Sequence, residues 1–281
     1  MKIAVTAASG RLGAQILHAL EEEVGAEHVI AVARTPANVR SRPVEVRKGD
    51  YNSRAELETA FAGVDTVLLV SSMDYPENRL GQHRNVIQAA RSAGVGKIVY
   101  TSIQGPEEGT AFSPIVQSNR RTEQDIRESG LQWVIGRNGI YIEPDIEYLD
   151  TYREMGAIVN CAGTGRCGYT TRSELACAYT QMILNDVHNG HTYNLHGEAL
   201  TQLQLAEYLN NTFGTTLEYR EVSVEEFRKQ SIEELGEFLG TIVGGIYEGI
   251  REGEADNPSD FETAAGRPHQ TWSDYFSGLR P

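Results

Sequence analysis

Residues 2–13, KIAVTAASGRLG, decide how this chain folds. The apolar run 2–6 predicts a strand, the small residues after it predict a tight turn, and residues 14–22 predict a helix. Where a strand passes directly into a helix, several backbone N–H groups lack a partner, and with the helix dipole they favour an anion. The stretch therefore predicts a site for the pyrophosphate of a dinucleotide.

Two glycines have separate tasks in this interpretation. Gly10 allows the backbone to approach the phosphates, and Gly13 allows the new helix to pack close to its strand. The full pattern has a third glycine where Ala7 stands, and a partial pattern is weak by itself. Its position between a predicted strand and a predicted helix favours the dinucleotide site over a plain strand-to-helix turn.

Strands and helices alternate along the first half of the chain with short connections. Further strands are predicted at 28–33, 44–51, 66–70, 97–102 and 131–135, and helices at 54–62, 81–93 and 119–129. This alternation is typical of an α/β fold with a Rossmann-like, doubly wound parallel sheet.

Two regions of different character are expected. Residues 1–140 are predicted to form the dinucleotide-binding domain, with residues 165–196 completing its sheet. Residues 141–164 and 197–281 are predicted to form a smaller, mostly C-terminal α+β domain on the substrate side. Within it, residues 232–251 form an apolar helical segment with five glycines, which suits either a mobile cover over a pocket or close helix packing.

The charge balance argues against several classes of partner. A net charge of −14 disfavours a general nucleic-acid or anionic-membrane binder, because such proteins present a basic face. No apolar run approaches the length of a membrane span, and no leader-like segment opens the chain, so a cytoplasmic location is expected.

No metal site is predicted. Cys161, Cys167 and Cys177 do not have zinc-site spacing. Three histidines between positions 188 and 196 fall in a turn that leads into a short strand, with no cysteine or well-spaced acid nearby.

The ends of the second and third strands indicate the adenine half of a cofactor. NAD-preferring sites carry an acid after the second strand for the ribose 2′-hydroxyl, but here Arg34 stands there. An arginine can bind a 2′-phosphate, so NADP is the predicted cofactor. Asp50 and Tyr51 close the third strand and are predicted to meet the adenine.

Hydroxyl side chains follow the next two strands. Ser71 and Ser72 come after the fourth strand, and Thr101 and Ser102 end the fifth. Because ligands of open α/β sheets bind outside the carboxyl ends of the strands, these residues are expected at one rim of the crevice.

An ordered set of motifs resembles a known family. The motifs are TAASGRLG at 6–13, Arg34, GDY at 49–51, QHRNVI at 82–87, YTS at 100–102, TE at 122–123 and RNGIY at 137–141. Together they resemble the NmrA-like atypical short-chain dehydrogenases, most closely the branch of NADPH:quinone oxidoreductase type 2 and triphenylmethane-dye reductase. The resemblance implies a Rossmann domain that binds NADPH and a smaller domain that closes over the nicotinamide. Members reduce quinones or dyes, or bind the dinucleotide as redox sensors.

Two positions depart from that family's pattern. The family usually has glycine at the position of Ala7. The branch often has histidine or lysine at the position of Asn119, four residues before Glu123. This helix therefore offers no charged group at position 119 to hold the nicotinamide ribose.

The chain also lacks the dyad of ordinary short-chain dehydrogenases, a tyrosine with a lysine four residues later. None of the 13 tyrosines has a lysine at that spacing. A quinone that receives hydride becomes a stabilised aromatic oxyanion, so it needs no dedicated acid. The predicted function is an NADPH-dependent reductase of a quinone or similar conjugated acceptor, and a homodimer is possible. The alternative is a non-catalytic NADP-binding redox sensor that regulates a partner protein.

The residues at or just after strand ends, with the positions that the resemblance adds, make up the predicted site. The predicted cofactor-binding residues are Thr6, Ala8, Ser9, Gly10, Arg11, Leu12, Gly13, Arg34, Asp50, Tyr51, Val70, Ser71, Ser72, Thr101, Ser102, Asn138, Gly139 and Ile140. The predicted catalytic residues are Tyr141 and Asn119, and Tyr141 is expected either to wall the acceptor pocket or to pack under the smaller domain.

Overall fold

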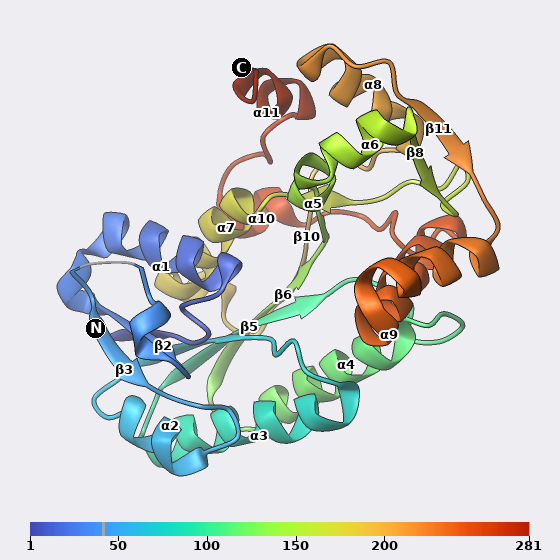
Figure 1. Cartoon of the computed structure of the whole chain (residues 1–281). Helices are drawn as coiled ribbons and strands as arrows, with labels where there is room; N and C mark the ends of the chain where they lie inside the picture. Colours follow the sequence, from blue (N-terminus) through green and yellow to red (C-terminus); the bar gives the residue numbers. More distant parts are fainter. Residues whose placement is uncertain (41–42, 281) are drawn as a thin grey trace.

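Seven strands form one parallel sheet at the centre of the molecule (Figure 1). The computed structural model describes residues 1–40 and 43–280. The strand order is β3-β2-β1-β4-β5-β6-β10, and every neighbouring pair is parallel. The strands are β1 (Ile3–Val5), β2 (Val29–Ala33), β3 (Glu45–Lys48), β4 (Thr66–Val70), β5 (Lys97–Ile103), β6 (Gln132–Asn138) and β10 (Thr192–Leu195). The predicted Rossmann-like sheet is confirmed.

Helices cover both faces of this sheet, which explains why every residue of β2 and β4 is buried. One layer contains α1 (Arg11–Val24), α7 (Arg172–Leu184) and α10 (Phe261–Ala265). The other layer contains α2 (Arg54–Ala60), α3 (Pro76–Ser92) and α4 (Ser113–Arg127). The direction of winding reverses between β1 and β4, and such a switch point opens a crevice at the carboxyl ends of the strands.

The remaining elements pack around a separate apolar core that includes Tyr169, Leu205 and Trp272. Two short parallel pairs, β7 with β9 and β8 with β11, belong to this part. Its elements are α5 (Glu143–Glu147), α6 (Leu149–Met155), α8 (Gln202–Phe213), α9 (Val224–Arg251), α11 (Trp272–Gly278), β7 (Ile140–Tyr141), β8 (Ala157–Asn160), β9 (Tyr169–Thr170) and β11 (Glu218–Glu221). β10 lies beside β6 in the central sheet, although it comes late in the chain.

Two helices begin earlier than the sequence pattern predicts. α3 begins at Pro76 rather than at residue 81, and α4 begins at Ser113 rather than at residue 119. Each has a proline in its first turn, where the missing N–H is not needed and the fixed φ suits a helix. The extra turns bring Arg79 and Ser118 into the helical layer next to the crevice.

α9 is a hairpin of two helical halves rather than one straight rod (Figure 1). Gly236 has φ 81° and interrupts the helix. The halves then cross closely, because a Cβ on Gly240 would lie 2.4 Å from the Ile232 backbone, and Arg228 Nη2 lies 2.8 Å from Glu248 Oε2. Close packing thus explains Gly240, and a role of α9 as a mobile cover stays a prediction.

Candidate active site in the sheet crevice

The start of α1 presents unpartnered backbone donors. Gly10 caps this helix without a side-chain hydrogen bond, and the first turn has no acidic residue. Within residues 1–40 and 43–280, the N–H groups of Arg11, Leu12 and Gly13 meet no acceptor. A cradle of free N–H groups at the N-terminus of a 14-residue helix fits a diphosphate.

The turn before this helix is too tight for side chains. A Cβ on Gly13 would lie 2.4 Å from the Ala7 carbonyl oxygen, and a Cβ on Gly10 would lie 3.2 Å from it. Ala7 has φ 48°, the left-handed conformation that glycine adopts with least strain. Ala8 is buried and donates its N–H to Val32 O at 3.1 Å, while Ser9 is exposed. The backbone therefore keeps the shape of the full pattern although its first glycine is missing.

Thr6 and Tyr51 tie β1 to β4 where the two strands diverge. Thr6 Oγ1 lies 2.9 Å from Leu68 O and accepts the Val70 N–H at 3.1 Å. The Tyr51 hydroxyl lies 2.5 Å from Thr6 Oγ1 and 2.8 Å from Val70 O. The ring of Tyr51 packs against the apolar core on the α2–α3 side of the sheet, with its hydroxyl already bound.

Arg34 and Asp50 stand at the carboxyl ends of β2 and β3. Arg34 is exposed, and within the described residues its guanidinium makes no hydrogen bond or ion pair. Asp50 Oδ1 accepts the backbone N–H of Asn52 at 2.9 Å. Hydrogen bonds from Asn78 and from the loop lower the pKa of Asp74, and the charge of Arg34 adds to this effect. Among the described residues Arg34 is therefore an exposed cation without a partner, whose charge reaches Asp74 in the loop after β4.

Arg11 makes an ion pair with the smaller part of the molecule. Its Nη1 lies 2.6 Å from Glu147 Oε2 at the end of α5. This ion pair joins the first turn of α1 to the smaller part of the molecule. The sequence predicts Arg11 as a cofactor-binding residue, but nothing in the sequence indicates the pairing with Glu147.

The predicted hydroxyl rim after β4 and β5 is present, but its members face different ways. The backbone N–H of Ser71 donates to Thr101 Oγ1 at 2.9 Å, and the N–H of Ser72 donates to His83 Nε2 at 2.9 Å. Burial and the charge of Arg79 lower the pKa of His83 to about 3, so this ring is neutral. The hydroxyl of Ser102 instead donates to Glu123 Oε1 at 2.7 Å, away from the other three.

Glu123 is the centre of a buried network of charges. Arg137 Nη2 lies 2.7 Å from Glu123 Oε2, and Arg120 and Arg127 also pair with this carboxylate. Burial acts to raise the pKa of Glu123, but the bonds from Arg137 and the charge of Arg120 hold it below its usual value. The network fixes the end of β6, where the RNGIY motif begins.

Asn119 lies inside the rim and is 1% exposed. Its Oδ1 accepts hydrogen bonds from Tyr100 Oη at 2.8 Å and from Arg79 Nη2 at 2.6 Å. The sequence predicts Asn119 here but does not indicate Arg79. The sequence offers one indication that Arg79 lies near this site: Arg79 stands one helical turn before His83, on the same face of α3.

The strand end that carries Asn138 leads into Tyr141. Asn138 Oδ1 accepts from Tyr179 Oη at 2.6 Å, and Asn138 Nδ2 lies 3.3 Å from Tyr141 Oη. The Arg172 guanidinium lies 5.2 Å from the centre of the Tyr141 ring. Burial raises the pKa of Tyr141, which keeps its hydroxyl protonated. The predicted Tyr141 therefore lies next to the predicted Asn138, with its ring packed against the apolar core.

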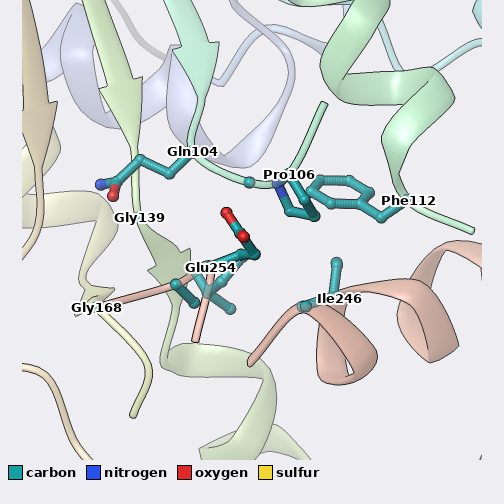
Figure 2. Close-up of a pocket in the computed structure, with 11 residues that line it drawn as sticks. Gln104, Pro106, Phe112, Gly139, Gly168, Ile246 and Glu254 are labelled. Carbon is teal, nitrogen blue, oxygen red and sulfur yellow. The ribbon is translucent and has the colours of Figure 1, made fainter. Parts of the chain in front are cut away.

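An apolar pocket opens beside Gly139 and Ile140 (Figure 2). Residues from the loop after β5, the start of α4, β7 and the second half of α9 enclose it. It is lined by Gln104, Gly105, Pro106, Phe112, Gly139, Ile140, Gly168, Ile246, Gly249, Glu254 and Ala255. Figure 2 shows the Glu254 carboxylate directed toward the loop that carries Gln104 and Pro106.

This pocket is nearly closed. Its volume of about 20 Å³ is space for roughly one water molecule. A ring-shaped ligand therefore enters only if side chains such as Phe112 and Ile246 move apart. Only Gly139 and Ile140 of its lining are predicted from the sequence, because the other walls come from distant segments with no motif of their own.

Other features of the described residues are less specific. Within residues 1–40 and 43–280, no group of three or more histidine, cysteine or acidic side chains is placed to hold a metal ion. His188 Nδ1 lies 3.0 Å from Tyr193 Oη instead. No helix in this part of the chain combines the length and apolarity that a membrane span requires.

Comparison with known proteins agrees with this geometry. Residues 7–158 match a family described as NAD(P)H-binding. Quinone oxidoreductase 2 of Escherichia coli strain K12 is 34% identical over 229 residues, which cover 80% of this chain and 79% of that protein. An NmrA-like family domain-containing oxidoreductase of Aspergillus flavus is 32% identical over 236 residues, 81% of this chain and 76% of that protein.

Solved structures extend the likeness to the whole chain. The Escherichia coli NADPH-dependent quinone oxidoreductase complexed with NADPH has a TM-score of 0.90 and 30% identity, and the match covers 99% of each chain. The Citrobacter sp. triphenylmethane reductase complexed with NADP(H) has a TM-score of 0.91 and 33% identity, covering 99% of this chain and 100% of that one. The resemblance to the NmrA-like branch is thus confirmed. The chain belongs to the NAD(P)H-binding family and is an NAD(P)H-dependent oxidoreductase that resembles quinone oxidoreductase 2 and triphenylmethane reductase.

Proposed function

We propose that the chain is an NADPH-dependent reductase that transfers hydride to a quinone or a similar conjugated small molecule. The observation that carries this proposal is the apolar pocket beside Gly139 and Ile140, which follow the end of β6 and are predicted to bind the cofactor. Phe112 and Ile246 offer the flat and aliphatic surfaces that stack against a conjugated ring. Bound NADPH would supply the hydride, and these residues would orient the acceptor over it.

The positions of the lysines support an acceptor that needs no dedicated acid. Lys97 is the first residue of β5, at the opposite end of this strand from Thr101 and Ser102, and its Nζ lies 3.2 Å from Ile183 O. Lys48 pairs with Glu56 at the surface, Lys229 lies on the exposed side of α9, and Lys2 precedes β1. No lysine of the described chain is therefore placed beside Tyr141 to form the dehydrogenase dyad.

The cofactor assignment rests on two features. Among residues 1–40 and 43–280, the N–H groups at the start of α1 are free and fit the pyrophosphate, and Arg34 has no partner and fits a 2′-phosphate. The other predicted cofactor contacts, the division into two domains, the cytoplasmic location and the homodimer stay predictions.

Turnover with defined acceptors tests the function. Purified protein is mixed with NADPH and a simple benzoquinone, a naphthoquinone or a cationic triphenylmethane dye, and NADPH oxidation is followed by absorbance. We expect saturable turnover with at least one acceptor, and none for Gly10→Val, whose branched side chain blocks the cradle. Tight NADPH binding without turnover of any acceptor would favour the redox-sensor alternative.

A second variant tests whether the site works without an acid. Tyr141→Phe should keep most of the turnover with an electron-poor quinone, because the proton can come from water. General acid catalysis contributes roughly a hundred- to ten-thousandfold, so a loss of that size with unchanged NADPH affinity would identify Tyr141 as the acid.

A further inference from the structure

Arg79 is a buried cation without a carboxylate partner. It is 3% exposed, and no acidic side chain of the described residues lies within ion-pair distance of it. Its Nε donates to Ser118 Oγ at 3.0 Å, one Nη donates to the Ser72 carbonyl, and the other donates to Asn119 Oδ1 at 2.6 Å. Asp74, whose charge acts on Arg79 without an ion pair, is half-buried and is hydrogen-bonded to Asn78 and Gln82 instead.

Such an arrangement is unfavourable for folding alone. Burying a charge without a counter-charge is expensive, and burial also lowers the pKa of this guanidinium. An apolar or amide side chain would fill the same space at a smaller cost in folding free energy. The position of the charge, at the rim beside Ser72 and Asn119, indicates that it acts on something in the crevice.

The hydrogen bonds of Arg79 fix the orientation of the Asn119 side-chain amide. A guanidinium can only donate, so it requires the carbonyl oxygen of Asn119 to face it. Tyr100 alone would not fix this orientation, because a hydroxyl can either donate to the oxygen or accept from the amide nitrogen. With Arg79 in place, the Nδ2 group of Asn119 faces the other way.

That amide group is free. Within residues 1–40 and 43–280, Asn119 Nδ2 donates no hydrogen bond. It is not one of the fully buried polar atoms without a partner, so it keeps a small contact with solvent. Asn119 therefore keeps an unused hydrogen-bond donor on the side of its amide that faces away from Arg79. Resting on the proposed function, we infer that Arg79 is a positioning residue: it turns the Asn119 amide into the crevice, where the amide donates to the ribose at the nicotinamide end of NADPH. The positive charge that α4 lacks at position 119 is thus supplied from α3.

Binding of two probes tests this role without any turnover. NADPH and 2′,5′-ADP, which lacks the nicotinamide half, are titrated by calorimetry into wild type, Arg79→Met, Arg79→Lys and Asn119→Ala. We expect Arg79→Met and Asn119→Ala to weaken NADPH about tenfold while 2′,5′-ADP changes less than about twofold. Arg79→Lys, which keeps the charge, should lose less. If wild type does not bind 2′,5′-ADP, the choice of NADP has failed and ADP takes its place as the adenine probe.

A matched control and a rescue complete the experiment. Arg84→Met removes another tie between α3 and α4, the pair in which Arg84 Nε lies 2.7 Å from Asp125 Oδ2, and should affect neither probe. Adding Asn119→Lys to Arg79→Met places a charge at position 119, where the related branch often has one, and should restore NADPH affinity. Equal losses for both probes, or unchanged NADPH affinity in Arg79→Met and Asn119→Ala, would overturn the inference. Because no acceptor is used, failure of quinone turnover would not affect this result.

Discussion

Substitution of Arg34 gives the most direct test of the cofactor preference. A charge-assisted hydrogen bond to phosphate contributes roughly 1.5–3 kcal/mol, so Arg34→Ala should weaken NADPH binding about ten- to hundredfold and leave NADH binding almost unchanged. Fluorescence titration with both cofactors measures this difference. Arg40→Ala, another exposed arginine in the same region, is the control and should alter neither affinity. Equal losses for NADPH and NADH in Arg34→Ala would reject Arg34 as the 2′-phosphate ligand.

At Ala7 the sequence departs from the family's usual glycine, but the backbone keeps the conformation that a glycine would adopt there. Its φ of 48° disfavours any side chain by roughly 1–2 kcal/mol, whereas glycine there loses about 0.5–1 kcal/mol more chain entropy on folding. Ala7→Gly should therefore raise stability by up to about 1 kcal/mol, or the melting temperature by roughly 2–4 °C. Thermal unfolding measures the change.

A helical alanine provides the comparison for that variant. Ala14→Gly lies in the first turns of α1, where glycine should lower stability by about 1 kcal/mol. A lower melting temperature for Ala7→Gly, similar to that of Ala14→Gly, would mean that the left-handed turn is not under strain.

Among the elements, α9 depends on its small residues for its position over the pocket. A Cβ on Gly245 would lie 2.2 Å from the Phe112 backbone nitrogen. Gly245→Ala should push α9 away from α4, destabilise the protein by about 1–3 kcal/mol and change KM for the acceptor more than the affinity for NADPH. Urea unfolding and steady-state kinetics measure both effects.

Gly81 is the matched control, since it lies within α3 and has nothing within 4 Å of its Cβ position. Gly81→Ala should stabilise the protein by up to about 1 kcal/mol. If Gly245→Ala were as harmless as Gly81→Ala, close packing would not be the reason for the glycines of α9.

The sequence predicts an element well when the residues that indicate it lie close together in the chain. The buried strand β4 is predicted with correct ends, because its apolar run and the hydroxyls after it lie in one short segment. The starts of α3 and α4 are missed, because Pro76 and Pro114 are typical of loops as well as of first turns. Arg79 lies in the missed turn of α3, and its partner Asn119 is 40 residues away. No local pattern connects the two.

On the scale of the whole molecule, contacts across the crevice join parts that the sequence treats separately. Arg11 of α1 pairs with Glu147 of α5, and the Tyr75 and Phe238 rings lie 4.2 Å apart between the loop after β4 and α9. The proposed pyrophosphate site can be predicted from the sequence because its glycines and the start of its helix are adjacent in the chain. The proposed acceptor pocket cannot be predicted in this way, because its walls come from segments that meet only after the chain has folded.

Stability of the whole molecule should depend on pH through two buried groups with opposite effects. His83 has a folded pKa of about 3 and an unfolded pKa near 6.5, because burial and Arg79 disfavour its charged form. As pH falls below about 6.5, the unfolded chain binds a proton that the folded chain cannot, so stability falls by up to about 5 kcal/mol toward pH 3. His83→Gln should flatten this slope in urea unfolding curves, and an unchanged slope would show that His83 is not held neutral.

Asp145 acts in the reverse direction. It is 5% exposed, its Oδ1 accepts from Tyr152 Oη at 2.8 Å, and burial raises its pKa from 3.8 to about 6. Between pH 4 and 6 the unfolded chain loses a proton that the folded chain keeps, so stability falls by about 3 kcal/mol as pH rises through that range. Asn at this position keeps the acceptor for Tyr152 and cannot ionise. Asp145→Asn should therefore stabilise the protein by about 2–3 kcal/mol at pH 7 and hardly at all at pH 3.5, as measured by urea unfolding at both values. An equal effect at the two pH values would show that packing, and not the ionisation of Asp145, sets the difference.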